Sequence, residues 1–265
     1  MTMATSVEKD ARSGRIVSVL FTATIFTSAL LLFFVQPLFT RMVLPQIGGA
    51  SAVWTTAMLF FQTVLIGGYL YAHLMTRYIP TLAQVGVHIA LLLLALMFLP
   101  LAVPQGWHYD PARPVVIQTL WLYMLGVGLP FAVLSANAPL IQSWYRKSGG
   151  PSADDPYFLY AASNLGSLFA LLAFPLVAEP LFGVTAISGG WSISFMVLGP
   201  LLLLSGLAAR KGAETEGKTP EATAARAAPG LRTLGYWAFL AFLPSSLMLC
   251  VTSKISTDLG SFPLV

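Results

Sequence analysis

The stretch FFVQPLFTRMVLPQIGGASAVW, Phe33 to Trp54, lies between two long apolar runs and decides how the first part of the chain is divided. Proline removes a backbone donor and disfavours a helical conformation at the residue before it. The pair Gln36-Pro37 is therefore predicted to end the first apolar helix. The residues that follow form either an outer loop lying on the membrane, with Arg41 among the headgroups, or a re-entrant segment that faces a cavity.

The composition outside this stretch is that of a membrane protein. Of the 265 residues, 57% are hydrophobic and only 9% are charged, whereas a soluble domain is typically about 25% charged. A chain with so few charges cannot cover a surface that faces water, which makes the lipid bilayer its expected partner. The single cysteine, Cys250, excludes a disulfide within the chain.

Seven stretches are long and apolar enough to cross a bilayer as helices of about 20 residues. None of them contains Asp, Glu, Lys or Arg. The predicted fold is an all-α polytopic membrane helix bundle. The predicted spans are Ile16–Gln36, Ala52–Ala72, Leu82–Val103, Val115–Ser135, Tyr157–Ala178, Thr185–Ala208 and Thr233–Ser253.

The positions of Lys and Arg predict the orientation of these spans. With the N-terminus on the cytoplasmic side, eleven of the fourteen basic residues fall in cytoplasmic segments. Only Arg41, Arg113 and Lys254 fall on the outer side. Cytoplasmic loops carry an excess of Lys and Arg, so we expect a multi-pass membrane protein with a cytoplasmic N-terminus.

The spacing of the spans predicts three parts of the chain. Residues 1–208 form a six-span half-domain, residues 209–231 a flexible cytoplasmic linker, and residues 232–265 a seventh span with an outer end. Six spans, a long inner loop and a further span are the layout of the major facilitator superfamily, which pairs two six-span halves. The chain is accordingly predicted to be the first half of such a fold plus one span, as a truncated product or fragment. A natural seven-span protein is the alternative.

Polar side chains within or beside the spans are candidates for a substrate pathway. Each has a second interpretation, because an amide in a membrane helix also joins neighbouring helices and a carboxylate at the membrane edge is also simply solvated. The same ambiguity holds near Pro130 and Pro139, where the fourth span is predicted to be interrupted either by a midplane site or by the inner interface. The candidates are Gln36, Arg41, Gln62, Asn137, Asn164 and Glu179.

Two further patterns concern packing and pairing. Ala162, Gly166 and Ala170 recur every four residues and predict a face of the fifth span that approaches another helix closely. His88 is alone on a leucine-rich span, which favours a hydrogen-bonded core histidine over a proton relay. Arg41 is predicted either to lie free in the outer loop or to pair with Glu179 at the same depth of the membrane.

The sequence contains no motif typical of an enzyme active site. The sequence holds no nucleotide-binding loop, catalytic triad, carboxylate pair or metal-ligand spacing, and its basic residues do not form a face for nucleic acid. No catalytic residue, metal or cofactor is therefore predicted.

Three stretches carry a resemblance to one family. They are SALLLFFVQPLFTRMVLPQIGGASAVWTTAMLFFQTVLIGGYLYAHL from Ser28, DPYFLYAASNLGSLFALLAFPLVAEPLFG from Asp155 and FLPSSLMLCVTSKISTDLGSFPL from Phe242. In this order they resemble the membrane region of bacterial fused major-facilitator/spermidine synthase proteins, and this resemblance implies a bacterial inner membrane. The resemblance implies further spans and a soluble aminopropyltransferase-like domain. The given sequence holds no polar stretch long enough to form such a domain.

The resemblance leaves three functions open. The first is a transporter-like membrane domain that handles a polyamine-related solute, alone or with a second membrane half. The second is a membrane anchor that transports nothing and holds an aminopropyltransferase-like partner. The third is an inactive fragment. Polar residues that face one shared cavity would favour the first function, and polar residues that are all paired between helices would favour the second.

Overall fold

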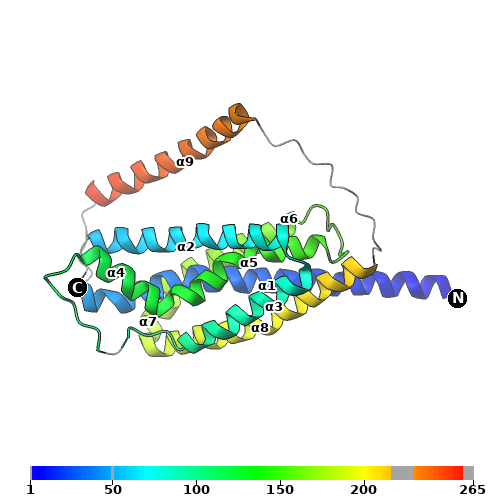
Figure 1. The fold of residues 1–265 in the computed structure, drawn as a ribbon, viewed down its shortest axis with the longest axis horizontal. Helices are drawn as coiled ribbons and strands as arrows, with labels where there is room; N and C mark the ends of the chain where they lie inside the picture. The colour runs from blue at the N-terminus through cyan, green and yellow to red at the C-terminus, as the bar shows by residue number, and fades with distance from the viewer. Residues whose placement is uncertain (1, 49–50, 105, 216–229, 259–265) are drawn as a thin grey trace. The chain divides into compact units, whose positions relative to one another are not determined.

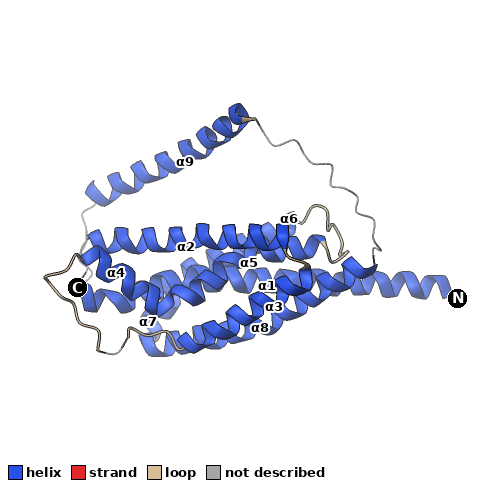
Figure 2. Cartoon of the chain, viewed as in Figure 1, coloured by secondary structure: helices blue, strands red, loops and turns tan. Residues whose placement is uncertain are grey.

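The computed structural model describes residues 2–48, 51–104, 106–215 and 230–258, and all regular structure within these ranges is helical (Figures 1 and 2). Six of the described helices are long and apolar enough to cross a membrane. The prediction of an all-α membrane bundle is confirmed. The helices are α1 (Thr2–Ile47), α2 (Ser51–Tyr78), α3 (Thr81–Ala95), α4 (Val115–Tyr123), α5 (Leu129–Arg146), α6 (Tyr157–Ala173), α7 (Glu179–Leu181), α8 (Val184–Thr215) and α9 (Leu231–Asp258).

The outer surface of the bundle is apolar. On α2, for example, Met58, Leu59, Ile66 and Leu70 are each more than half exposed. Soluble monomers rarely expose contiguous apolar patches of this kind, whereas lipid tails solvate them well. Together with the six apolar helices, this surface identifies the chain as a multi-pass membrane protein.

Helix α1 does not end at Gln36-Pro37, and this sequence prediction is wrong. The helix passes through both Pro37 and Pro45 and ends at Ile47. Membrane helices tolerate proline, and Pro37 removes the backbone donor that would otherwise reach the carbonyl of Phe33. Phe39 is fully buried against neighbouring helices, and this packing offsets the lost backbone bond. The segment is therefore neither a surface loop nor a re-entrant turn.

Helices α1 and α6 lie side by side and run in the same direction. The pairs Phe26–Gly166 and Phe34–Phe174 have the same sequence separation, as expected for parallel helices in register. A Cβ atom built on Gly166 would lie 2.5 Å from the carbonyl oxygen of Phe26. The predicted close approach along the small-residue face of the fifth span is thus confirmed, and α1 is the neighbour.

Two of the spans contain a short π-helical segment just before or at a proline. Met124–Gly128 joins α4 to α5 ahead of Pro130, and Phe174–Ala178, which contains Pro175, joins α6 to α7. The wider turn accommodates the proline ring without breaking the helix. The fourth span is therefore continuous to Arg146, and the prediction that prolines interrupt it is wrong.

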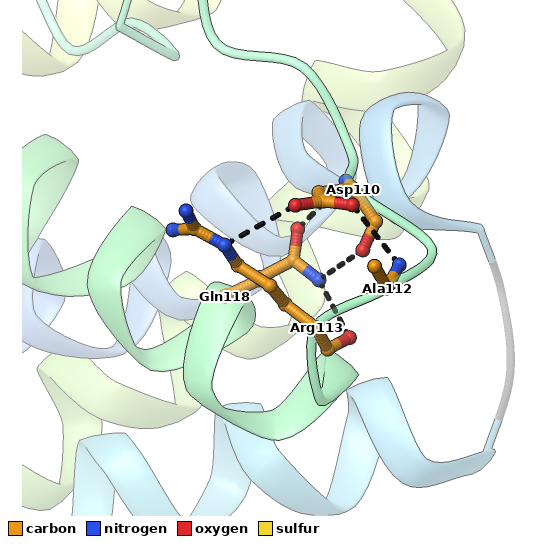
Figure 3. A network of polar contacts seen from close by, with 4 residues as sticks. All are labelled: Asp110, Ala112, Arg113 and Gln118. Carbon is orange, nitrogen blue, oxygen red and sulfur yellow. Dashed lines mark hydrogen bonds and ion pairs between the residues drawn. The ribbon is translucent and has the colours of Figure 1, made fainter.

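The third span ends earlier than Val103. After α3 a single 3-10 turn closes at Phe98, and Leu99 is extended because it precedes Pro100. The following connection is fixed to the start of α4 by Gln118 (Figure 3). The Gln118 amide accepts from the Asp110 backbone over 2.9 Å and donates to the carbonyls of Asp110 and Arg113. Arg113 also lies 3.2 Å from the Asp110 carboxylate.

The chain divides into two compact units, Met1–Gly217 and Lys218–Val265. In the first unit α8 continues through the start of the predicted linker to Thr215, and the remainder of that linker, residues 216–229, lies outside the described residues. In the second unit α9 contains the whole of the predicted seventh span, Thr233–Ser253.

Candidate functional site

A cavity of about 540 Å³ lies among four helices of the first unit. Cavities of roughly 300–1,000 Å³ are typical of small-molecule sites. Its walls come mainly from α1, α2 and α5, and Ser163 of α6 adds one hydroxyl. Trp54, Phe61 and Tyr69 of α2 provide aromatic surface.

Two of the sequence candidates, Gln36 and Gln62, line this cavity from different helices. The Gln36 amide nitrogen donates to the Leu32 carbonyl over 3.3 Å, which leaves the amide oxygen available to the cavity. Gln62 is exposed on α2 and makes no side-chain hydrogen bond to any described residue. Within the described residues, the Gln62 amide therefore does not join α2 to another helix, as one of its two interpretations required.

Asn137 is instead fully buried at the centre of a hydrogen-bonded network. Its side-chain oxygen lies 2.6 Å from Nε2 of His88, and its side-chain nitrogen donates to the Ser28 hydroxyl over 2.7 Å. Nδ1 of His88 lies 3.5 Å from the Tyr71 hydroxyl. The network joins α1, α2, α3 and α5, and His88 is the hydrogen-bonded core histidine that the sequence favours.

The network lies between two cavities. Ser28 lines the large cavity, whereas Tyr71 and His88 line a second one of about 250 Å³ between α2, α3 and α5. Sequence reasoning did not single out Ser28 or Tyr71, because an isolated hydroxyl in a membrane helix gives no signal of its own. Only the packing of α1 against α5 brings Ser28 to Asn137.

A second polar contact between α3 and α5 lies one turn before His88. Gln84, also fully buried, accepts from the Trp144 indole over 2.9 Å and donates to the Ile79 carbonyl over 2.6 Å. Beyond the end of the span, Lys147 donates to the Thr81 hydroxyl over 3.3 Å, and partial burial lowers the pKa of the Lys147 ammonium. The spacing of Gln84 and His88 by four residues on an apolar helix is the sequence signal that could have predicted this polar face.

Arg41 and Glu179 form an ion pair. Arg41 Nη1 lies 2.6 Å from Glu179 Oε1, and about 40% of each side chain is exposed (37% and 42%). The parallel register of α1 and α6 brings the two residues to one end of the bundle, and the turn Phe174–Ala178 leads directly into Glu179. Of the two interpretations of Arg41, the structure selects the pair over the free headgroup position.

Asn164 lies away from these contacts. It is exposed on α6, and it is not among the residues that line the large cavity. The six candidates are therefore divided among one cavity (Gln36 and Gln62), one buried network (Asn137), one ion pair (Arg41 and Glu179) and one exposed position (Asn164).

We expect the ion pair to couple its two residues energetically. The structure has a single contact, Nη1 to Oε1, and Arg41→Lys keeps the positive charge while losing the guanidinium geometry. Glu179→Gln removes the negative charge, so it should weaken the contact more than Arg41→Lys does. The double variant should lower the melting temperature by less than the sum of the two single effects. The coupling should be about 0.5 kcal/mol, since both side chains are partly solvated. Strict additivity in a thermal unfolding series would show that the pair contributes nothing.

Comparisons with known proteins do not place the chain in a family. No family model, curated protein or solved structure matches it. Within the described residues, no three His, Cys, Asp or Glu side chains gather as the ligands of a metal would.

Proposed function

We propose that the chain is a transporter-like membrane domain whose large cavity binds a small polar solute. The observation that carries this proposal is the meeting of Gln36 and Gln62, from two different helices, on one cavity of about 540 Å³. An exposed amide is costly against lipid, whereas it is useful as a hydrogen-bonding group in a solute pathway.

The order of the helices supports a half-domain of the major facilitator kind. The first, second, fourth and fifth spans line the cavity, and the third and sixth do not. Such a half would work together with a second membrane half. The resemblance to fused major-facilitator/spermidine synthase proteins supports a polyamine-related solute and an aminopropyltransferase-like partner.

The chemistry of the cavity suits an amine. Trp54, Phe61 and Tyr69 line the cavity, and aromatic rings attract ammonium groups through their quadrupoles. The free amide oxygens of Gln36 and Gln62 accept hydrogen bonds from N–H donors. No charged side chain is among the described residues that line the cavity, so an amine would be held by hydrogen bonds and aromatic surface.

Asn137 favours the alternative function, a membrane anchor for an enzyme. Both polar atoms of this amide have partners on other helices, which is the arrangement that a packed scaffold without a pathway would have. The two proposals differ in what they require of the cavity residues. A transporter needs them to bind its solute, whereas an anchor does not need them for its function.

Equilibrium binding separates the two. Purified protein in lipid nanodiscs should bind radiolabelled spermidine, and Gln62→Leu should weaken binding about tenfold through loss of one hydrogen-bonding group. Asn164→Leu removes an equally exposed amide outside the cavity and should leave binding unchanged. Absence of spermidine binding by the unaltered protein would reject the transporter proposal in favour of the anchor.

We further propose that the N-terminus is cytoplasmic in a bacterial inner membrane. In a Cys250→Ser background, a cysteine at Ala112 should react with an impermeant maleimide in intact cells. A cysteine at Ser148, in the connection between α5 and α6, should react only after permeabilisation. The expectation follows from the excess of Lys and Arg in the segments assigned to the cytoplasm. Labelling of the Ser148 position in intact cells would reverse the orientation.

A further inference from the structure

The hydrogen-bonded network at Asn137 ends at Ser28 in the wall of the large cavity. The direction of its hydrogen bonds determines whether Ser28 offers the cavity a donor or an acceptor. The Asn137 nitrogen donates to Ser28, so the Asn137 oxygen faces His88. Because that oxygen carries no hydrogen, the 2.6 Å contact requires a proton on Nε2 of His88. Nδ1 is then the acceptor, and it faces the Tyr71 hydroxyl.

The donors in this network therefore all point the same way. Tyr71 donates to His88, His88 donates to Asn137, and Asn137 donates to Ser28. An amide cannot pass a proton along such a series, so the network is not a proton relay. It is a fixed alignment of dipoles that ends at Ser28.

The Ser28 hydroxyl has no acceptor of its own within the described structure. Several hydroxyl groups on these helices turn back to a carbonyl three or four residues earlier, as Thr24 does to Leu20 and Thr40 does to Gln36. Ser28 makes only the contact in which it accepts from Asn137. It is 97% buried and lines the large cavity, so a solute in that cavity could supply the acceptor that its proton lacks.

We infer that Ser28 is a hydrogen-bond donor of the large cavity, held in that role by Asn137 and His88, and that the cavity takes an amine that also carries a hydrogen-bond acceptor. This inference rests on the proposed function and narrows its solute class. Ser28 and Gln36 are eight residues apart on α1, or about 12 Å along the helix axis. An elongated solute can therefore place an acceptor such as an amide carbonyl at Ser28 and an ammonium group near Gln36.

Competition binding in nanodiscs tests the solute class. N1-acetylspermidine, which carries an amide carbonyl, should displace radiolabelled spermidine with about tenfold higher affinity than unlabelled spermidine does, the effect of one satisfied donor. Ser28→Ala should abolish this preference. Ser167→Ala removes a hydroxyl of α6 that donates to the Asn164 carbonyl and is not among the residues lining the cavity, so this variant should retain the preference.

Asn137→Asp separates a role in polarity from a role in packing. The carboxylate is nearly the same size as the amide but has no N–H, so Ser28 would turn its proton toward it and away from the cavity. We expect this variant to lose the preference for N1-acetylspermidine although Ser28 is intact. Retention of the preference in Asn137→Asp or in Ser28→Ala would overturn the inference.

The tautomer of His88 gives a readout that needs no solute. The chain has three histidines, so a difference ¹⁵N spectrum between the unaltered protein and His88→Asn assigns the ring nitrogens. The spectrum should report a proton on Nε2, and a proton on Nδ1 would overturn the inference.

The binding experiments separate the inference from the proposed function. Equal affinity for spermidine and N1-acetylspermidine would overturn the inference but leave the proposed function standing. Failure of both amines to bind would overturn the proposed function as well.

Discussion

Gly166→Leu should prevent the first unit from folding to its native packing. Any side chain at this position meets the backbone of α1, because a Cβ atom would lie 2.5 Å from the Phe26 carbonyl oxygen and 3.3 Å from its Cα. Backbone atoms of a packed helix cannot move aside as the end of a flexible side chain can. We expect a loss of at least about 3 kcal/mol, or roughly a 10 °C lower melting temperature, measured by fluorescence-detected size-exclusion chromatography after heating.

Leu171→Phe is the matched control on the same helix. Leu171 is 50% exposed, so a larger apolar side chain extends into lipid and should change neither the yield nor the melting temperature. Equal stability of the two variants would mean that α1 and α6 are not in close contact, and the parallel register that brings Arg41 to Glu179 would then have no support.

Asn137→Leu should have the second-largest effect. Leucine has a similar size but leaves the Nε2 proton of His88 without an acceptor in a fully buried position. A buried polar group without a partner costs about 1–3 kcal/mol, and interhelical bonds in membranes lie toward the lower part of that range. We expect about 1.5 kcal/mol of destabilisation in a thermal or denaturant unfolding series.

Asn164→Leu provides the comparison. It is the same chemical change on an exposed face of α6, where no interhelical bond is lost. Its unfolding midpoint should equal that of the unaltered protein. A midpoint for Asn137→Leu that matches the one for Asn164→Leu would show that the network contributes specificity without stability.

The sequence by itself determined the class of fold, because a membrane span must form all of its backbone hydrogen bonds within the span. Its apolar side chains can face either lipid or a neighbouring helix. Seven apolar stretches predicted helices, and every one lies in or overlaps a helix of the described structure. The small-residue face at Gly166 could also be predicted from nearby residues, since residues four apart lie on one side of a helix. These features depend on neighbours in the sequence alone.

The end of α1 illustrates where local rules stop. Gln36-Pro37 has the local signature of a helix end, yet the helix continues to Ile47. The cost of one missing backbone bond is local, but the compensation is not, because Phe39 packs against Tyr123 of α4 with ring centroids 5.2 Å apart.

Only the tertiary structure decided how the polar candidates were grouped. Gln36, Gln62, Asn137 and Glu179 are equivalent in sequence, as polar residues within or beside apolar spans. The structure places two of them on one cavity, encloses the third between His88 and Ser28, and pairs the last with Arg41. The physical reason is that a hydrogen bond or ion pair between helices depends on their register and rotation. These are set by contacts between residues far apart in the chain, such as Phe26 with Gly166.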